Sequence, residues 1–419
     1  MTRRHAHGPH EDRESDRGMR PLGPLLPFDR ARRLALDAVR PIGRTEVVDL
    51  AEADRRVAAD DVRSRIDVPN AVRAAMDGYA IVARDTSGAS PSSPVRLRRI
   101  GSVHAGASFR GRTARGRCVE IATGASLPPG TDAVVMVERT GRRGDVVEVH
   151  EPVRRGENVS PRGEDIRRGS VVVRDGDVLT PARVGALSAV GRTRVRVYAR
   201  PRVAIFTTGD EVVPPGRRIH PGQVYDVNSR TLASVVRTNG GEPLVLGSAG
   251  DRLASLRSIV RRALRADLIV SSGGSSVGSR DLIADLVAGR GRLLFHGIAI
   301  KPGRPTVLGM LGRTPMLGMP GYPTSCLTNA YVLMAPMLRR MARLPPEVPR
   351  SVEVALAQDL ESPRGKVEFH TVRIVRDRAV SAARGSSAIT SMAHADGFVE
   401  IPADVTRLRR GARVRVVLF

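Results

Sequence analysis

Hydrophobic positions between residues 201 and 344 alternate between short β-branched runs and longer segments with helical spacing. Strands are predicted at Val203–Thr207, Pro243–Leu246, Asp267–Ser271, Leu293–His296, Thr306–Met310 and Pro315–Gly318. Helices are predicted at Ser229–Thr238, Leu253–Leu264, Asp281–Val287 and Pro323–Leu344. Strands and helices that alternate in this way are typical of a mostly parallel sheet covered on both faces. The pattern therefore predicts an α/β domain over residues 201–344.

The segments on either side have a different pattern. Residues 1–24 lack periodicity and are expected to form a disordered tail, whereas helical spacing extends from Pro27 to Leu50. A strand-like region follows, and short strands with a helix at Pro181–Val190 lead up to residue 200. After Pro345 helical signals vanish, which predicts a small β domain with strands at Val352–Ala357, Val367–Val375, Phe398–Ile401 and Val414–Leu418.

Length and composition are those of an intracellular globular protein. A chain of 419 residues is expected to fold into roughly two to four domains. No segment approaches the roughly 18 consecutive apolar residues that a membrane span needs. Cys118 and Cys326 are isolated, which argues against a disulfide scaffold and a zinc site. We therefore expect a cytoplasmic protein without a membrane segment.

The net charge of +25 is carried almost entirely by arginine, because only Lys301 and Lys366 are lysines among 68 basic residues. This distribution indicates a general preference for arginine, and basic residues seldom alternate with aromatic ones as they do on nucleic-acid surfaces. We expect no nucleic-acid partner. The charge should instead attract anionic small molecules.

Four segments at the predicted carboxyl ends of the strands have the content of a ligand site, which is where open α/β sheets bind ligands. They are Thr208–Glu211, Gln223–Ser229, Ser271–Gly278 with Asp281, and Met319–Ser325. Glycine allows backbone N–H groups to approach an oxyanion, and the Pro-Gly turn before a predicted helix suits phosphate. Asn228 or Ser229 is expected to cap the helix that follows. Each segment alone is a weak signal, but together they predict a phosphate-binding site.

Charged residues in these segments suggest a metal ion and a fixed cation. Asp210, Glu211, Asp226 and Asp281 are carboxylates at this edge, and Asp226 with Asp281 is the preferred pair for Mg²⁺, which takes hard oxygen ligands. Lys301 lies in a proline-flanked segment, where its retention suggests that the site needs an ammonium group. The alternative is that both lysines escaped the arginine bias by chance, and the strand-like surroundings of Lys366 favour that interpretation for Lys366.

Several motifs in a fixed order resemble a known family. In the α/β region they are Ser272–Gly278 with Asp281, Lys301–Pro305 and Pro320–Pro323. In the N-terminal half they are Ala75–Ala80, Ala122–Ala125, Val134–Glu138 and Arg162–Ile166. Together they resemble the molybdopterin molybdenumtransferases of the MoeA type, related to the C-terminal domain of gephyrin. The resemblance covers about residues 26–419.

The resemblance implies a homodimer with a multidomain α/β plus β fold. A split platform would be formed by residues 25–68 and 153–200, with a β domain inserted at residues 69–152. A molybdopterin-binding catalytic α/β domain would follow at residues 201–344, and a small β barrel at residues 345–419. The implied reaction cleaves adenylylated molybdopterin with Mg²⁺, releases AMP and delivers molybdate. A molybdopterin adenylyltransferase is thereby a candidate partner.

The resemblance also implies roles for individual residues. The metal-binding and catalytic acids would be Glu211, Asp226 and Asp281, and the catalytic cations Lys301 and Arg304. Substrate-binding positions would be Thr208, Gly209, Asp210, Ser272, Gly273, Gly274, Ser275, Ser276, Pro320, Gly321, Pro323, Thr324 and Ser325. The site of the other subunit would receive Asp77, Thr123, Arg162 and Asp165.

Three residues depart from the family pattern. Arg304 stands where a second lysine is common, Tyr322 where asparagine is frequent, and Val72 where an aspartate often precedes the Met-Asp-Gly-Tyr motif. The first two lie in the expected site, so tungstate is an alternative to molybdate as the oxyanion.

Functions from other classes make different demands on the chain. A molybdopterin adenylyltransferase would share only the α/β domain and would not need the preceding 200 residues. A scaffold protein would need a partner groove, and a nucleic-acid binder would bind with a steep salt dependence. The long N-terminal half favours the transferase over the adenylyltransferase.

Overall fold

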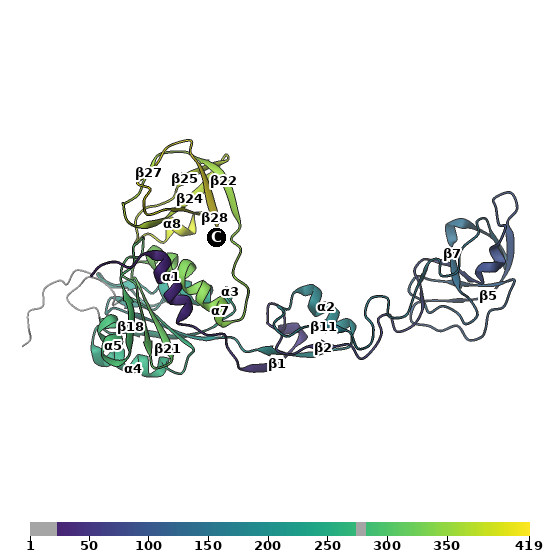
Figure 1. Cartoon of the computed structure of the whole chain (residues 1–419), viewed down its shortest axis with the longest axis horizontal. Coiled ribbons are helices and arrows are strands. Elements are labelled where there is room, and N and C mark those ends of the chain that lie inside the picture. The colour runs from purple at the N-terminus through teal and green to yellow at the C-terminus, as the bar shows by residue number, and fades with distance from the viewer. Residues whose placement is uncertain (1–22, 274–281) are drawn as a thin grey trace, which may run out of the picture. The chain divides into compact units, whose positions relative to one another are not determined.

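The computed structural model describes residues 23–273 and 282–419, so most of the expected N-terminal tail lies outside the described residues (Figure 1). Two compact units are present. The first unit contains the chain up to Arg44 together with Tyr198–Phe419, and the second unit is Thr45–Val197. None of the described helices has the length and apolar character needed to cross a membrane.

A six-stranded sheet forms the centre of the first unit. Its order is β16 (Glu242–Ala249), β13 (Arg202–Thr208), β17 (Leu268–Ser272), β21 (Thr314–Met319), β20 (Val307–Leu311) and β18 (Arg292–His296). The first four strands are mutually parallel, and β20 and β18 are antiparallel to their neighbours. The predicted mostly parallel α/β domain is therefore confirmed.

Helices cover both faces of this sheet, because β13 is apolar on both sides. Val203 and Ile205 enter one core, and Ala204 and Phe206 enter the other, as the two-residue repeat of a strand requires. The first core is completed by α1 (Phe28–Asp37), α3 (Asn228–Thr238), α6 (Pro323–Asn329) and α7 (Ala335–Met341). The second core is completed by α4 (Leu253–Ala263) and α5 (Leu282–Arg290) (Figure 1).

Two helices differ from the sequence expectation. The helical pattern from Pro27 to Leu50 ends at Asp37, since Pro41 and Gly43 follow, and residues Thr45–Asp49 form strand β1. The single helix expected at Pro323–Leu344 is divided by a π-helical turn at Ala330–Met334. Pro336 follows that turn, and the wider turn accommodates a residue that lacks an N–H and crowds the preceding carbonyl.

Helix α1 packs with the α/β domain. Phe28, Ala31 and Ala35 are buried in the first core, and the Arg44 guanidinium donates to both carboxylate oxygens of Asp267 at 2.7 and 2.8 Å. The resemblance assigned residues 25–68 to the platform. The contacts place the part up to Arg44 in the first unit instead.

The second unit contains two groups of strands. A six-stranded sheet of order β7 (Ala133–Met136), β4 (Gly78–Ile81), β6 (Arg117–Ile121), β5 (Val95–Val103), β9 (Val146–Val149) and β8 (Thr140–Arg143) lies within residues 69–152. A separate core joins β1, β2 (Val62–Arg63), β11 (Val171–Val173), α2 (Pro181–Ala189) and β12 (Arg194–Tyr198). Chain segments on both sides of the six-stranded sheet therefore share one core.

The C-terminal region is a closed five-stranded barrel. Its strands are β22 (Ser351–Leu356), β24 (Val367–Val375), β25 (Arg378–Ser381), β26 (Gly397–Ile401) and β28 (Arg413–Leu418). Closure results because β24 pairs with both β25 and β26, so the predicted barrel is confirmed. The expectation of no further helix was wrong, since α8 forms at Thr390–Ala393. Strand β19 (Ile300–Lys301) pairs with β24 and joins the Lys301 segment to the barrel.

Candidate active site

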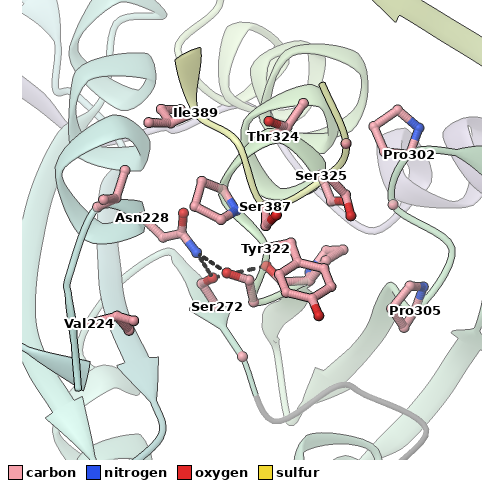
Figure 2. A pocket seen from close by; sticks show the side chains of 18 of the residues that line it. Val224, Asn228, Ser272, Pro302, Pro305, Tyr322, Thr324, Ser325, Ser387 and Ile389 are labelled. Atoms are coloured by element: carbon pink, nitrogen blue, oxygen red, sulfur yellow. Dashed lines mark hydrogen bonds between the residues drawn. The ribbon is translucent and has the colours of Figure 1, made fainter. Parts of the chain in front are cut away.

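A cavity of about 1580 Å³ in the first unit collects the loops at the carboxyl ends of β13, β17 and β21, the Lys301 segment and the edge of the barrel (Figure 2). The predicted site residues that line it are Thr208, Gly209, Glu211, Asp226, Ser272, Gly273, Lys301, Arg304, Pro320, Gly321, Pro323, Thr324 and Ser325. The predicted residues Gly274, Ser275, Ser276 and Asp281 lie outside the described residues. Segments that are distant in sequence thus share one cavity.

Asn228 fixes three of these loops to one another. Its Nδ2 donates to Ser272 Oγ at 2.8 Å and to the Gly321 carbonyl at 2.7 Å, and the Ser272 hydroxyl donates to the Pro320 carbonyl at 3.1 Å (dashed lines in Figure 2). Because the Gly321 carbonyl can only accept, these bonds fix the orientation of the amide. The buried Asn228 Oδ1 has no donor among the described residues.

Asp226, and not Asn228 or Ser229, provides the side-chain cap of α3. The Ser229 N–H donates to Asp226 Oδ1 at 2.9 Å, which leaves Asn228 free to hold the loops. The expected cap was therefore wrong by two or three positions. Asp226 still lines the cavity, and its Oδ2 lies 3.5 Å from the Thr207 hydroxyl.

Two glycines permit close approach of the backbone. A Cβ at Gly273, where φ is +90°, would lie 2.6 Å from the Thr208 carbonyl oxygen. A Cβ at Gly303, where φ is +113°, would lie 2.4 Å from Asn329 Oδ1. Asn329 Nδ2 donates to the Gly303 carbonyl at 3.2 Å and to Thr306 Oγ1 at 2.5 Å. Side chains are therefore excluded where the loops touch.

Lys301 is paired with a carboxylate from the barrel. Its Nζ lies 3.1 and 3.3 Å from the two oxygens of Glu368, a residue only 3% exposed. His370 Nδ1 lies 3.1 Å from Glu368 Oε1, and His370 Nε2 lies 2.8 Å from Ser381 Oγ. An ionised carboxylate can only accept, so His370 donates to Glu368 through Nδ1. When the imidazole is neutral, its Nε2 accepts a hydrogen bond from the Ser381 hydroxyl.

Opposing effects act on the pKa of Glu368. Burial is the largest and raises the pKa, but the hydrogen bonds from His370, Lys301 and Ser362, with the positive charge of Lys301, together lower the pKa below its ordinary value. Glu368 therefore stays ionised and keeps the ammonium group of Lys301 in place. Sequence reasoning missed both Glu368 and His370.

The carboxylates of the cavity are suited to a hard cation. Glu211 and Asp226 line it, although the described residues contain no group of three metal-binding side chains. Glu211 lies over the backbone of Gly209, where a Cβ would be 2.5 Å from Glu211 Oε2. Mg²⁺ takes one or two carboxylates and completes its shell with substrate phosphates and water, so these oxygen donors fit it.

Two predicted binding residues are engaged in holding loops. Asp210 does not line the cavity; its backbone and that of Asp251 exchange long hydrogen bonds with each other's carboxylates, at 3.3 and 3.5 Å. The Thr324 hydroxyl donates to the Ala388 carbonyl at 2.8 Å, which ties the start of α6 to the barrel. Asp251 lines the cavity and was not anticipated.

The predicted residues of the second unit form two clusters. Thr123 donates to Asp77 Oδ1 through its backbone N–H at 2.7 Å and its hydroxyl at 3.0 Å, and the backbone bond is the main cause of a lowered pKa for Asp77. Arg162 Nε donates to Asp67 Oδ2 at 2.7 Å, and Asp165 is exposed. The structure brings Asp77 and Thr123 together, while Arg162 pairs with a residue that was not predicted.

Barrel residues on the cavity escaped sequence reasoning almost completely. They are Lys366, Glu368, Phe369, His370, Thr371, Ala383, Gly385, Ser386, Ser387, Ile389 and Ser391. The rarity of lysine was the one sequence signal for this wall, because the two lysines of the chain, Lys301 and Lys366, both line the cavity. The strand-like surroundings of Lys366 had favoured its retention by chance.

Three family models match the chain in order. The MoeA N-terminal region (domain I and II) matches residues 26–191, the probable molybdopterin-binding domain residues 204–340, and the MoeA C-terminal region (domain IV) residues 353–419. These matches define a protein of molybdenum cofactor biosynthesis.

Similar proteins cover nearly the whole chain. The molybdopterin molybdenumtransferase 2 of Mycobacterium tuberculosis is 34% identical over 90% of this chain and 95% of that protein. The molybdopterin molybdenumtransferase of Haemophilus influenzae is 34% identical over 76% of this chain and 78% of that protein. A structure of the molybdopterin biosynthesis MoeA protein of Pyrococcus horikoshii has a TM-score of 0.80 at 32% identity, and covers 94% of this chain and 100% of that chain. The chain therefore belongs to the MoeA family of molybdopterin molybdenumtransferases, which are transferases.

Proposed function

We propose that the chain transfers molybdate to adenylylated molybdopterin and releases AMP in a Mg²⁺-dependent reaction. The observation that carries the proposal is that one cavity is lined both by carboxylates, Glu211 and Asp226 among them, and by the cations Lys301 and Arg304. A metal-bound, multiply charged phosphate substrate needs both kinds of group. Similar proteins are named molybdopterin molybdenumtransferase, and this name supports molybdate as the transferred group and molybdopterin as the group that receives it.

The residues of the cavity would have three different roles, namely metal binding, anion binding and positioning of the backbone. Glu211 and Asp226 would hold Mg²⁺ together with Asp281, and the ion when bound supplies charge neutralisation at the phosphate oxygens. Lys301, fixed by Glu368, and Arg304 bind the anionic groups. The loops fixed by Asn228 keep the backbone of Gly273 and Gly321 at the ligand. Fixed donors need no reorganisation during the reaction, which is the usual source of electrostatic catalysis.

AMP release tests this function directly. The purified chain is incubated with adenylylated molybdopterin, Mg²⁺ and molybdate, and each component is left out in turn. We expect AMP and molybdenum cofactor only in the complete mixture. AMP release that is independent of molybdate would refute the transferase proposal. Replacing molybdate by tungstate then measures the oxyanion preference of this chain. Arg304 and Tyr322, the two departures from the family pattern that line the cavity, are the residues expected to affect it, and Tyr322 is 62% exposed.

The proposal includes a homodimer in which Asp77, Thr123, Arg162 and Asp165 act in the site of the other subunit. A molybdopterin adenylyltransferase is the proposed source of the substrate. The Asp77–Thr123 cluster supports the first part, because its carboxylate is exposed and ionised at neutral pH.

Mixed dimers test the sharing of sites. Asp77→Asn and Asp226→Asn keep an oxygen that can accept the short backbone hydrogen bonds from Thr123 and Ser229, and they remove the charge. If the sites are shared, mixing the two inactive variants restores one intact site per mixed dimer, and activity rises toward half of the parent value. Verified subunit exchange without recovered AMP release would show that Asp77 acts within its own chain or only as a turn residue.

A further inference from the structure

A row of aromatic rings joins the barrel to the α/β domain. The rings are those of Phe28, Phe369, Phe398, Phe419 and Tyr331, with successive centroids 5.2, 5.4, 5.9 and 5.3 Å apart. The chain has only seven phenylalanines and five tyrosines, and no tryptophan, so five of its twelve aromatic rings lie in this row. A chain with few aromatic side chains has thus gathered many of them at one place.

Both ends of the row belong to the α/β domain, and its middle belongs to the barrel. Phe28 begins α1, and Tyr331 lies in the π-helical turn; both pack in the first core. The other three rings are Phe369 on β24, Phe398 on β26 and Phe419 directly after β28. The strand register brings the first two together, because Phe369 and Phe398 are diagonal neighbours across β24 and β26. The rings therefore hold the barrel between two points of the α/β domain.

The row runs next to the residue that holds Lys301. Phe369 directly follows Glu368, and successive residues of a strand point to opposite sides. The Phe369 ring is accordingly fixed in the first core, while the Glu368 carboxylate contacts the ammonium group of Lys301. One peptide unit links the two, so a displacement of the ring would move the carboxylate with it.

The ring contacts fix direction as well as distance. Phe369 meets its two neighbours edge to face, at interplanar angles of 72° and 84°, and Tyr331 stacks on Phe419 at 27°. These are the arrangements that aromatic pairs prefer. Phe419 remains 47% exposed, which is far more than a side chain that only fills a core. The end of the row at Phe419 and Tyr331 is thus suited to attachment more than to burial.

We infer that the row positions Glu368 and, through it, the ammonium group of Lys301, with Tyr331 and Phe419 as positioning residues. Neither of these two rings lines the cavity, so both act on it from a distance. The inference rests on the ring contacts and on the Lys301–Glu368 pair. It does not depend on which reaction the cavity carries out.

The presence of only two lysines, Lys301 and Lys366, makes a direct test possible. Protein labelled with ¹³C at the lysine ε-carbon gives one signal from each, assigned with Lys366→Gln, and Glu368→Gln shows where the Lys301 signal lies without its partner. We expect Tyr331→Leu and Phe419→Leu to move the Lys301 signal toward that position, and Tyr331→Phe, which keeps the ring, to leave it in place. A Lys301 signal that stays at the parent position in both leucine variants, or in Glu368→Gln, overturns the inference.

A substitution in the other core separates positioning from a general loss of stability. Phe206 is fully buried in the second core, on the opposite face of the sheet. Phe206→Leu should lower the urea midpoint at least as much as Phe419→Leu, because the side chain that it shortens is completely buried, yet it should leave the Lys301 signal in place. An equal shift of that signal with Phe206→Leu would show that any loss of packing displaces the lysine, and would refute a specific role for the row.

The AMP assay measures the consequence for the reaction. Phe419→Leu should lower kcat/KM about two- to tenfold, the factor that corresponds to loss of one aromatic pair, and Tyr331→Phe should keep the parent value. Equal losses with Tyr331→Phe and Tyr331→Leu would show that the ring itself is not needed and would overturn the inference. A chain that releases no AMP would refute the proposed function and not the row, which the lysine signals test by themselves.

Discussion

The two walls of the cavity are held in place by different forces. On the α/β wall, Asn228 joins Ser272 and Gly321 through neutral hydrogen bonds of 2.8 and 2.7 Å. On the barrel wall, Glu368 holds Lys301 through a charged pair of 3.1 Å and is itself held by His370. The first arrangement fixes backbone, and the second fixes a charge.

This difference predicts different sensitivities. A neutral hydrogen bond contributes about 0.5–1.5 kcal/mol net, whereas one to a charged group contributes about 1.5–3 kcal/mol. A buried charge that loses its partner also keeps its desolvation cost. The barrel wall should therefore respond more strongly to substitution. Of the two sets of holding contacts, only the one around Glu368 contains titratable side chains.

Glu368→Gln should have the largest effect. The change keeps the shape of the side chain but removes the charge that positions the Lys301 ammonium. We expect kcat/KM for AMP release to fall about 10- to 100-fold, as for loss of a charge-assisted bond. Asp359→Asn is the matched control, because Asp359 pairs with Arg407 outside the cavity. Equal effects of the two substitutions would argue against a positioning role for Glu368.

Lys301→Arg should have the next largest effect even though the charge is kept. A planar guanidinium cannot occupy the position of a compact ammonium against both oxygens of Glu368 in a proline-flanked segment. A loss of about tenfold in kcat/KM is expected. Activity equal to the parent would show that lysine is retained at this position without a functional reason.

Asn228→Ala should have a smaller effect, about three- to tenfold on kcat/KM, because two neutral hydrogen bonds are lost. Ser229→Ala serves as the control on the same helix, since only the backbone of Ser229 bonds to Asp226. If Asn228→Ala lowered kcat/KM more than Glu368→Gln does, the α/β wall would be the more sensitive of the two walls, contrary to this prediction.

The same contrast explains how far the sequence could predict the site. Thr208, Ser272 and Pro320 lie at the carboxyl ends of parallel strands, so the sheet rule identifies them as neighbours from the order of the strands and helices along the chain. The strands of the barrel are mostly antiparallel, so no one edge of it is preferred in this way. Glu368 reaches Lys301 only because β19 pairs with β24 across 67 residues of sequence, a register that no local pattern encodes.

The helices and strands were also predicted unequally well. Val367–Val375 was predicted with its observed ends because it is rich in β-branched residues, which favour a strand. The π-helical turn at Ala330–Met334 was missed, since an apolar helical pattern continues through it, and only Pro336 marks the change.

The smallest predicted effect is on the stability of the fold. Its dependence on pH should differ between the two walls. The pKa of Glu368 is lower in the folded chain than its ordinary value of 4.5, although burial acts in the opposite direction. A carboxyl with a lowered pKa stabilises the folded state above the ordinary pKa, and this contribution is lost as the pH falls through the lowered value.

The difference in free energy of unfolding between the parent and Glu368→Gln should be on the order of 1 kcal/mol at neutral pH and should shrink below about pH 4.5. For Asn228→Ala the difference should stay constant, because no group in that hydrogen-bonded set titrates in this range. Urea unfolding at a series of pH values measures both differences. A constant difference for Glu368→Gln would show that the carboxylate does not stabilise the fold through its charge, and the barrel wall would then be held in the same way as the α/β wall.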